Sequence, residues 1–245
     1  MIDEHTARQL KKAGIVKDGF RYPKHVGFSF SGNEQWASVK RLDVSDAYGK
    51  MFDKVHKILE CQVKYDIPIM TVYLLTSSVL QMDHFSEMMS RLSLFFSDLA
   101  GSEFLQKNKI KVSILGKWYD LPGNIIDPIK KVLDGTKDFD NFFLNLCINY
   151  DGQEEIVDAC RLIVRRILAE RANVDSIDKQ MIKENIYSSY FLPPDLIIRL
   201  GRRNLNSFLL WDTTQSIIYF SDTYWQDFSE KDLLQAIKFY QENRR

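Results

Sequence analysis

The stretch of sequence that decides the fold is PKHVGFSFSGNEQWA, residues 23–37. Its HVGFSFS segment, residues 25–31, has the length and apolar content of a buried strand. Gly32 and Asn33 then form a polar turn, because both residue types favour turn conformations. Beyond them, apolar residues recur at helical spacing and predict a long amphipathic helix that packs on a sheet; they are Met51, Val55, Ile58, Leu59 and Val63.

The rest of the chain continues this alternation of strand-like and helix-like segments. Apolar runs of strand length occur at residues 67–76, 110–115, 142–148 and 196–200, and the chain then runs through residues 208–211 and 217–220. Helical patterns occur at residues 85–99, 154–171, 177–189 and 230–243, and a short helix is expected after Pro122, ending near Gly135. Such alternation is typical of an α/β fold, a mainly parallel sheet flanked by helices. No repeat or linker divides the chain, so residues 1–245 are expected to form a single domain with a polar leader over residues 1–22.

Composition excludes several classes of protein. Hydrophobic residues at 45% and charged residues at 27% are ordinary for a globular chain, and no apolar run is long enough to cross a bilayer. Lys plus Arg equals Asp plus Glu at 33 each, so we expect no nucleic-acid partner. The first residues, MIDEHTARQLKKAG, lack the apolar core of a signal peptide. A cytoplasmic location is therefore expected, with peripheral contact to a membrane left open.

The opening stretch resembles the signature of the cis-prenyltransferase, or undecaprenyl diphosphate synthase, family, which runs roughly P-x-H-V-A-I-I-M-D-G-N-x-R-W-A. Later motifs match in the same order. They include Asn149-Tyr150 with Gly152, Asp195-Leu196 with Arg199, Phe208-Leu209-Leu210-Trp211, and Tyr219-Phe220 with Trp225. The resemblance implies a parallel-sheet fold with a long apolar tunnel between helices and dimeric assembly. It also implies a synthase that adds isopentenyl units to an allylic diphosphate in cis geometry.

Several positions depart from this family pattern at the residues that carry charge. Ionising a carbon–oxygen bond requires cations for the departing diphosphate and carboxylates to hold magnesium on it. The family's magnesium-binding Asp aligns with Ser31, its second magnesium carboxylate with Ile217, and an Arg that binds the allylic diphosphate with Gln35. The Glu, Asn and Arg of its catalytic loop align with Ser78, Val79 and Met82.

These departures lead to a first hypothesis of a non-catalytic subunit in a heteromeric cis-prenyltransferase that makes long-chain polyprenyl diphosphate for a glycosyl carrier lipid. The chain itself would then hold no metal and no catalytic residue, and Mg²⁺ would lie on a catalytic partner subunit. The resemblance places substrate contacts at Gly32, Asn33, Arg199, Arg202 and Arg203. It places the partner interface at Phe208, Trp211, Tyr219 and Trp225, although such aromatic residues ordinarily form a core.

Two alternatives remain open. The chain could be an unconventional homodimeric enzyme, prenyl-transferring or terpenoid-forming, that uses Arg199, Arg202 and Arg203 with no metal on Ser31. It could also be a stand-alone protein that binds isoprenoids without chemistry. The first hypothesis lacks one expected feature, because the family's C-terminal R-x-G tail is present only as Arg244-Arg245.

Overall fold

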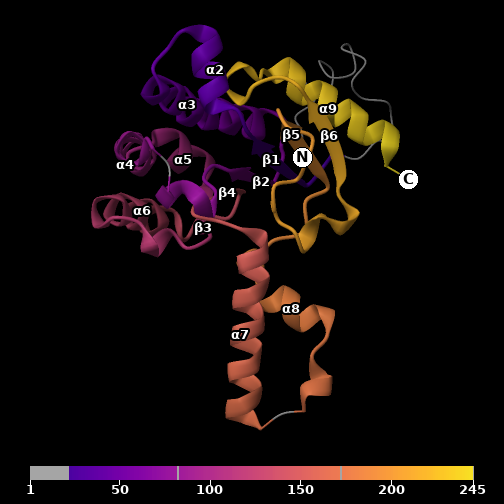
Figure 1. Ribbon diagram of the computed structural model, residues 1–245. Coiled ribbons are helices and arrows are strands. Elements are labelled where there is room, and N and C mark those ends of the chain that lie inside the picture. Colours follow the sequence, from indigo (N-terminus) through magenta and orange to yellow (C-terminus); the bar gives the residue numbers. More distant parts are fainter. Residues whose placement is uncertain (1–21, 82, 172, 245) are drawn as a thin grey trace.

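The computed structural model describes residues 22–81, 83–171 and 173–244 (Figure 1). Residues 1–21 of the predicted leader, as well as Met82 and Arg245, lie outside these ranges. The described strands form one six-stranded sheet in the order β3-β4-β2-β1-β5-β6, and every neighbouring pair is parallel. Their bounds are β1 His25–Phe30, β2 Ile69–Tyr73, β3 Ile110–Leu115, β4 Phe142–Cys147, β5 Leu196–Leu200 and β6 Ile217–Ser221. The predicted α/β fold is confirmed.

The helices connect these strands as a parallel sheet requires. They are α2 Asn33–Lys40, α3 Val44–Lys64, α4 Phe85–Ala100, α5 Glu103–Asn108, α6 Gly123–Thr136, α7 Gly152–Glu170, α8 Lys179–Asn185 and α9 Glu230–Asn243. Short 3₁₀ turns include η1 Ser77–Gln81, η4 Asp212–Gln215 and η5 Trp225–Asp227. Among the described residues, none of the helices has the length and apolar character needed to cross a membrane.

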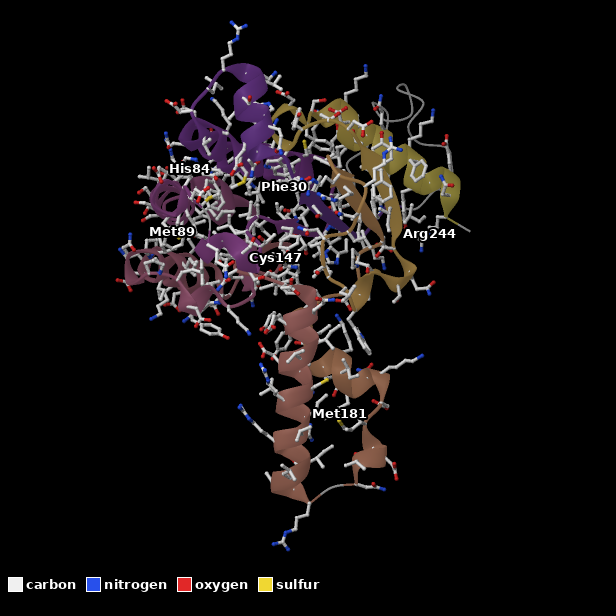
Figure 2. The ribbon with its side chains drawn as sticks, in the orientation of Figure 1. Phe30, His84, Met89, Cys147, Met181 and Arg244 are labelled. Carbon is white, nitrogen blue, oxygen red and sulfur yellow. The ribbon has the colours of Figure 1, made fainter. Side chains whose placement is uncertain are left out.

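The main core lies between one face of the sheet and the helices α3, α4, α6 and α9. Alternate residues of β1 point into it, because successive strand side chains face opposite sides of a sheet. Phe30 stacks on Trp225 with ring centroids 4.5 Å apart, and Phe52 of α3 stacks on Phe95 of α4 at 5.0 Å. Figure 2 shows side chains, including the labelled Phe30 and Met89, crowding this region. The apolar tunnel that the resemblance implies stays a prediction.

A smaller cluster covers the other face of the sheet near the carboxyl ends of the strands. Phe208 lies directly on β1, since a Cβ at Gly27 would come within 2.8 Å of the Phe208 ring. The ring also stacks on Tyr73 of β2 at 5.4 Å. The loop that follows β5 is thereby fixed to the sheet.

Helices α7 and α8 form an arm that projects from the body of the molecule (Figure 1). The two helices pack on each other along the arm. Asp151 caps α7, accepting hydrogen bonds from the backbone N–H groups of Gln153 at 2.7 Å and Glu154 at 3.3 Å. The arm leaves the body after β4 and returns to it before β5, so its root lies beside the central strands.

Candidate functional site

The candidate site lies where β1 and β5 end side by side. The sheet order changes direction at this pair, with β2, β4 and β3 on one side and β6 on the other. Ligands of open parallel sheets bind outside the carboxyl ends of strands at such a switch point. A cavity of about 340 Å³ lies there, lined by Ser31, Gly32, Gln35, Gly201, Arg202 and Tyr224.

Two glycines bring the backbones of this cavity together. Gly32 has φ +96° and Gly201 has φ +82°, a left-handed region that glycine adopts without steric cost. A Cβ at Gly201 would lie 2.9 Å from Ser31 Oγ, so a side chain there would push the two turns apart. Ser31 Oγ instead accepts a hydrogen bond from the backbone N–H of Arg202 at 3.2 Å.

Arg199 supplies a buried positive charge beside this cavity. The residue is only 1% exposed. Its guanidinium donates to the carbonyl of Asn204 at 2.5 Å, the carbonyl of Leu200 at 3.0 Å, the side chain of Asn204 at 3.2 Å and Ser31 Oγ at 3.4 Å. Burial, with a smaller effect of Arg202, lowers the pKa of Arg199.

Arg199 has no carboxylate partner within the described part of the chain, since all four of its hydrogen bonds go to neutral oxygens. A buried charge without a counterion is costly, and an arginine fork matches the oxygens of a phosphate group. Helix α2 begins at the same place, and no described side chain caps its first N–H groups. Such a helix start favours anions. The arrangement therefore fits a diphosphate.

The same residues do not fit a magnesium ion. Mg²⁺ prefers charged oxygen ligands, whereas the lining of the cavity contains no carboxylate. Within the described ranges no group of three or more His, Cys, Asp or Glu residues could hold a metal. The described residues at the cavity therefore offer an anion cations and N–H groups.

The structure brings some predicted substrate contacts together and separates others. Ser31, Gly32 and Arg202 line the cavity, and Arg199 contacts Ser31. The Asn33 side chain is instead turned inward, accepting from Gln226 Nε2 at 2.8 Å and donating to the sulfur of Met51 at 3.3 Å.

Arg203 is likewise directed away from the cavity. Its side chain is 73% exposed and pairs with Asp222 at 3.4 Å. Asn204, which orients Arg199, was missed as a site residue because only the folded loop brings its carbonyl and side chain onto the guanidinium. A glycine directly after β5 was the one signal that a tight turn occurs there.

Two of the four predicted interface aromatics belong to the core of this chain. Phe208 and Trp225 are fully buried, and Trp225 Nε1 donates to the carbonyl of Met51 at 2.9 Å. Their side chains are therefore unavailable to a partner, because the protein's own sheet and helices already enclose them. Trp211 and Tyr219 are partly buried, and their interface role stays a prediction.

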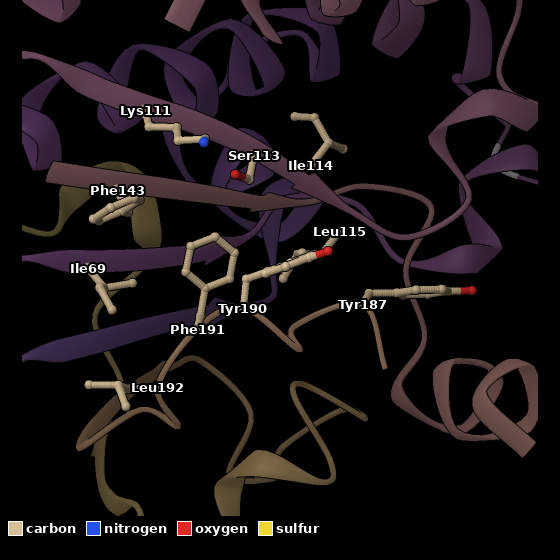
Figure 3. Close-up of a pocket in the computed structure, with 10 residues that line it drawn as sticks. All are labelled: Ile69, Lys111, Ser113, Ile114, Leu115, Phe143, Tyr187, Tyr190, Phe191 and Leu192. Atoms are coloured by element: carbon tan, nitrogen blue, oxygen red, sulfur yellow. The ribbon is translucent and has the colours of Figure 1, made fainter. Parts of the chain in front are cut away.

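A second, largely apolar cavity of about 540 Å³ lies over β2, β3 and β4 (Figure 3). Phe143 and Ile69 form its floor together with Lys111 and Ser113, and the segment after α8 contributes Tyr190 and Phe191. Ile69 begins β2, so this cavity extends toward the amino ends of the strands, away from the cavity at Ser31. It lies on the sheet face opposite the main core.

The fold and the site together define an α/β protein with a cavity at the carboxyl ends of its central strands and a buried arginine beside it. The family described as "Putative undecaprenyl diphosphate synthase" matches residues 30–245, and the chain belongs to this cis-prenyltransferase family. A lavandulyl diphosphate synthase from Lavandula x intermedia, solved in complex with dimethylallyl diphosphate, shares the fold with a TM-score of 0.86 at 24% identity. That likeness covers 91% of this chain and 97% of the lavandulyl synthase.

Archaeal relatives are closer in sequence. A protein of Thermoplasma volcanium is 34% identical over 226 residues, covering 91% of this chain and 88% of its own length. A protein of Methanocaldococcus jannaschii is 30% identical over 242 residues, which cover 97% of this chain and 86% of that protein. Both are named tritrans,polycis-undecaprenyl-diphosphate synthase (geranylgeranyl-diphosphate specific).

These names contradict the hypothesis of a non-catalytic subunit, because the relatives are named as enzymes. The hypothesis rested on the charged residues that are missing at Ser31, Gln35 and Ile217, which were interpreted as a loss of catalysis. The sequence does not show that Arg199 is buried at the strand ends without a carboxylate partner among the described residues. The alternative of an enzyme agrees better with the relatives.

Proposed function

We propose that the chain is a prenyl-transferring enzyme that binds an isoprenoid diphosphate in the cavity between Ser31 and Arg202. The observation that carries the proposal is Arg199, a buried residue whose guanidinium donates, within the described chain, only to neutral oxygens. A diphosphate in the cavity would supply the missing negative charge.

The reaction would break the bond between C1 of an allylic substrate and its diphosphate oxygen. A new carbon–carbon bond would form to the double bond of isopentenyl diphosphate, which then loses a proton. Negative charge grows on the leaving diphosphate, where Arg199, the Arg202 backbone N–H and the first turn of α2 would meet it. Removing one such donor typically costs about 10²–10³ in rate.

The substrate that we propose is a long allylic diphosphate such as geranylgeranyl diphosphate, as the names of the archaeal relatives suggest. We further propose that the enzyme works as a homodimer. Helix α7 exposes Val157, Val164 and Leu168, whose spacing of seven and four residues puts them on one helical face. An exposed apolar helix face of this kind suits contact with a second copy of the arm.

The test is an assay of the purified full chain with geranylgeranyl diphosphate and radiolabelled isopentenyl diphosphate, run both with Mg²⁺ and with EDTA. Polyprenyl product is expected from the unchanged chain and from Arg166→Gln, a control that removes an arginine paired with Glu170 on the arm. Arg199→Gln is expected to lose at least about 100-fold in rate. A folded Arg199→Gln variant that turns over at the unchanged rate would refute the assigned site.

The absence of carboxylates from the cavity lining favours a second candidate, an isoprenoid-diphosphate-binding protein without transfer activity. Binding of geranylgeranyl diphosphate with no product under either metal condition would select this candidate. If geranylgeranyl diphosphate does not bind with Mg²⁺ or with EDTA, both candidate functions are excluded.

A further inference from the structure

Two carboxylates are buried together at the root of the arm. Glu155 in the first turn of α7 is 1% exposed, and Asp212 at the start of η4 is 5% exposed. Ser188, which follows α8, joins them: its backbone N–H donates to Glu155 at 3.3 Å and its hydroxyl donates to Asp212 at 2.6 Å. Residues far apart in the chain thus share one buried polar cluster.

Two further side chains complete this arm-root network, which comprises Tyr150, Glu155, Lys183, Ser188 and Asp212. The Tyr150 hydroxyl donates to Glu155 at 2.6 Å, and Lys183 of α8 pairs with Asp212 at 2.7 Å. Within the described chain, Lys183 is the one cation that bonds to the carboxylate pair. With both carboxylates ionised, the network therefore carries an excess negative charge in a buried place.

The network also reaches the loop that orients Arg199. This loop, residues 201–211, is called the arginine loop; it contains Asn204 and is followed directly by Asp212. Its middle is fixed to the arm root because the Gly152 N–H donates to the Ser207 carbonyl at 3.1 Å. A Cβ at Gly152 would lie 2.2 Å from that carbonyl, so the two backbones are in close contact. On the other side, Tyr73 stacks on Phe208 and donates to the Tyr150 carbonyl at 2.9 Å.

The arginine loop needs this support because its backbone is strained. Asn206, Ser207 and Leu209 have φ of 49°, 59° and 43°, left-handed values that are unfavourable for residues with a side chain. Such conformations persist only where the surroundings hold them, and they cluster at sites that bind or switch.

We propose that Glu155 and Asp212 are positioning residues that couple the docking of the arm to the conformation of the arginine loop, and that loss of the Glu155 proton loosens both. The coupling between arm and loop stands on the contacts above. Its consequence for a bound diphosphate rests on the proposed function.

The surroundings of Glu155 favour its protonated form, as the proposal requires. Burial raises the pKa of Glu155 to about 7, and Asp212 adds to the effect while hydrogen bonds from Tyr150 and Ser188 oppose it. Two other titratable groups lie near Glu155: Cys147 of β4 and Tyr187, which follows α8. His25 of β1 lies near Asp212 and Lys183. A raised carboxyl pKa gives stability that is complete below the ordinary value of 4.5 and is lost as pH rises through about 7.

This shift sets the size of the expected effect. If Glu155 regains its ordinary pKa when the arm opens, the open population grows about tenfold between about pH 6 and pH 8. Glu155→Gln, which resembles the neutral acid, should abolish that dependence. Glu154→Gln is the matched control, because Glu154 is the exposed neighbour that pairs with Lys117.

The experiment is hydrogen–deuterium exchange of the full chain across this pH range, corrected for intrinsic exchange and followed in residues 179–192 and 201–211. The unchanged chain and Glu154→Gln should lose protection about tenfold in both segments as pH rises, whereas Glu155→Gln should show no such step. Ser188→Ala, which removes one bridge and keeps the carboxylates, should uncouple the two segments. A step that persists in Glu155→Gln, or segments that respond independently in the unchanged chain, would overturn the proposal.

Inorganic pyrophosphate then separates this proposal from the proposed function. Because coupling is reciprocal, pyrophosphate that protects residues 201–211 should also protect residues 179–192, and Ser188→Ala should abolish only the latter effect. Protection of the loop without the arm in the unchanged chain refutes the coupling. Protection of neither segment refutes the diphosphate site, and the pH dependence alone then decides the coupling.

Discussion

Arg199 is the buried cation of the candidate site. Burying an arginine without a carboxylate lowers its pKa and is unfavourable unless a ligand completes the charge balance. Asn204 and Leu200 fix the plane of the guanidinium by accepting from three of its N–H groups. The fixed orientation leaves one edge directed at Ser31, where an anion would bind.

Pyrophosphate should therefore stabilise the chain through Arg199. A ligand at about 100 times its Kd adds about 2.7 kcal/mol to the free energy of unfolding. We expect a pyrophosphate-dependent rise in Tm for the unchanged chain and for Arg166→Gln, and none for Arg199→Gln. Arg199→Lys should give a smaller rise, since an ammonium keeps the charge but loses the planar fork. An equal rise in Arg199→Gln would mean that pyrophosphate binds elsewhere.

Gly201 should be sensitive to the smallest substitution. Gly201→Ala places a Cβ at φ +82° and 2.9 Å from Ser31 Oγ, and strain of this kind costs about 1–3 kcal/mol. Gly135→Ala in α6 is the matched control, because its Cβ meets no atom within 4 Å and alanine favours a helix by about 0.5–1 kcal/mol. Urea unfolding of the two variants should give shifts of opposite sign. Equal effects would show that the turn at Gly201 is not constrained.

The sequence was informative about residue types at the site and uninformative about their directions. Motif order located Ser31, Arg199 and Arg202 together at the strand ends. It placed Trp225 at an interface, whereas the folded chain stacks that ring on Phe30 inside the core. Side-chain direction depends on tertiary packing, which a motif does not encode.

At the scale of elements, strands and long helices followed from hydrophobic pattern. The bounds of β3 Ile110–Leu115, β5 Leu196–Leu200 and α9 Glu230–Asn243 agree with those predicted. The prediction failed at α8, which ends at Asn185 although a helix was expected to residue 189. Ser188 is used there to bridge Glu155 and Asp212, a contact between distant segments that no local pattern reveals. The short α5 Glu103–Asn108 was also missed, since six residues give little periodicity.

The arm should depend on its cap at the root. Asp151 accepts two backbone N–H bonds at the start of α7, so Asp151→Ala should lower the free energy of unfolding by about 0.5–2 kcal/mol. Asp151→Asn should restore most of the loss because asparagine is also a good N-cap. Denaturant unfolding measures both variants. If the alanine variant is as stable as the unchanged chain, the cap contributes nothing and the root of α7 is held by packing alone.

At the scale of the whole molecule, one parallel sheet organises the site, the core and the arm. One face carries the helices of the main core. The strand ends carry the cavity proposed to bind a diphosphate, and the arm root meets the same ends through Gly152 and Tyr150. A change at the arm root should therefore be detectable in the stability of the entire domain.

The free energy of unfolding of Glu155→Gln, relative to the unchanged chain, should rise with pH between about 4.5 and 7. Above its ordinary pKa of 4.5, the unfolded Glu155 has lost its proton while the folded one still binds it up to about pH 7, so the unchanged chain loses stability over this range. The slope cannot exceed about 1.4 kcal/mol per pH unit for one proton. His25, whose pKa burial lowers to about 4, acts in the opposite direction in both proteins and cancels from the difference. A pH-independent difference would contradict the buried-acid assignment.

The central claim is that the cavity between Ser31 and Arg202 binds the diphosphate of an isoprenoid substrate. A crystal structure of the full chain with a non-hydrolysable thiolo analogue of geranylgeranyl diphosphate tests it most directly. The diphosphate should lie at the ends of β1 and β5, within hydrogen-bond distance of the Arg199 guanidinium and the Arg202 backbone N–H. A diphosphate bound elsewhere, with Arg199 still directed only at Asn204, Leu200 and Ser31, would contradict the claim.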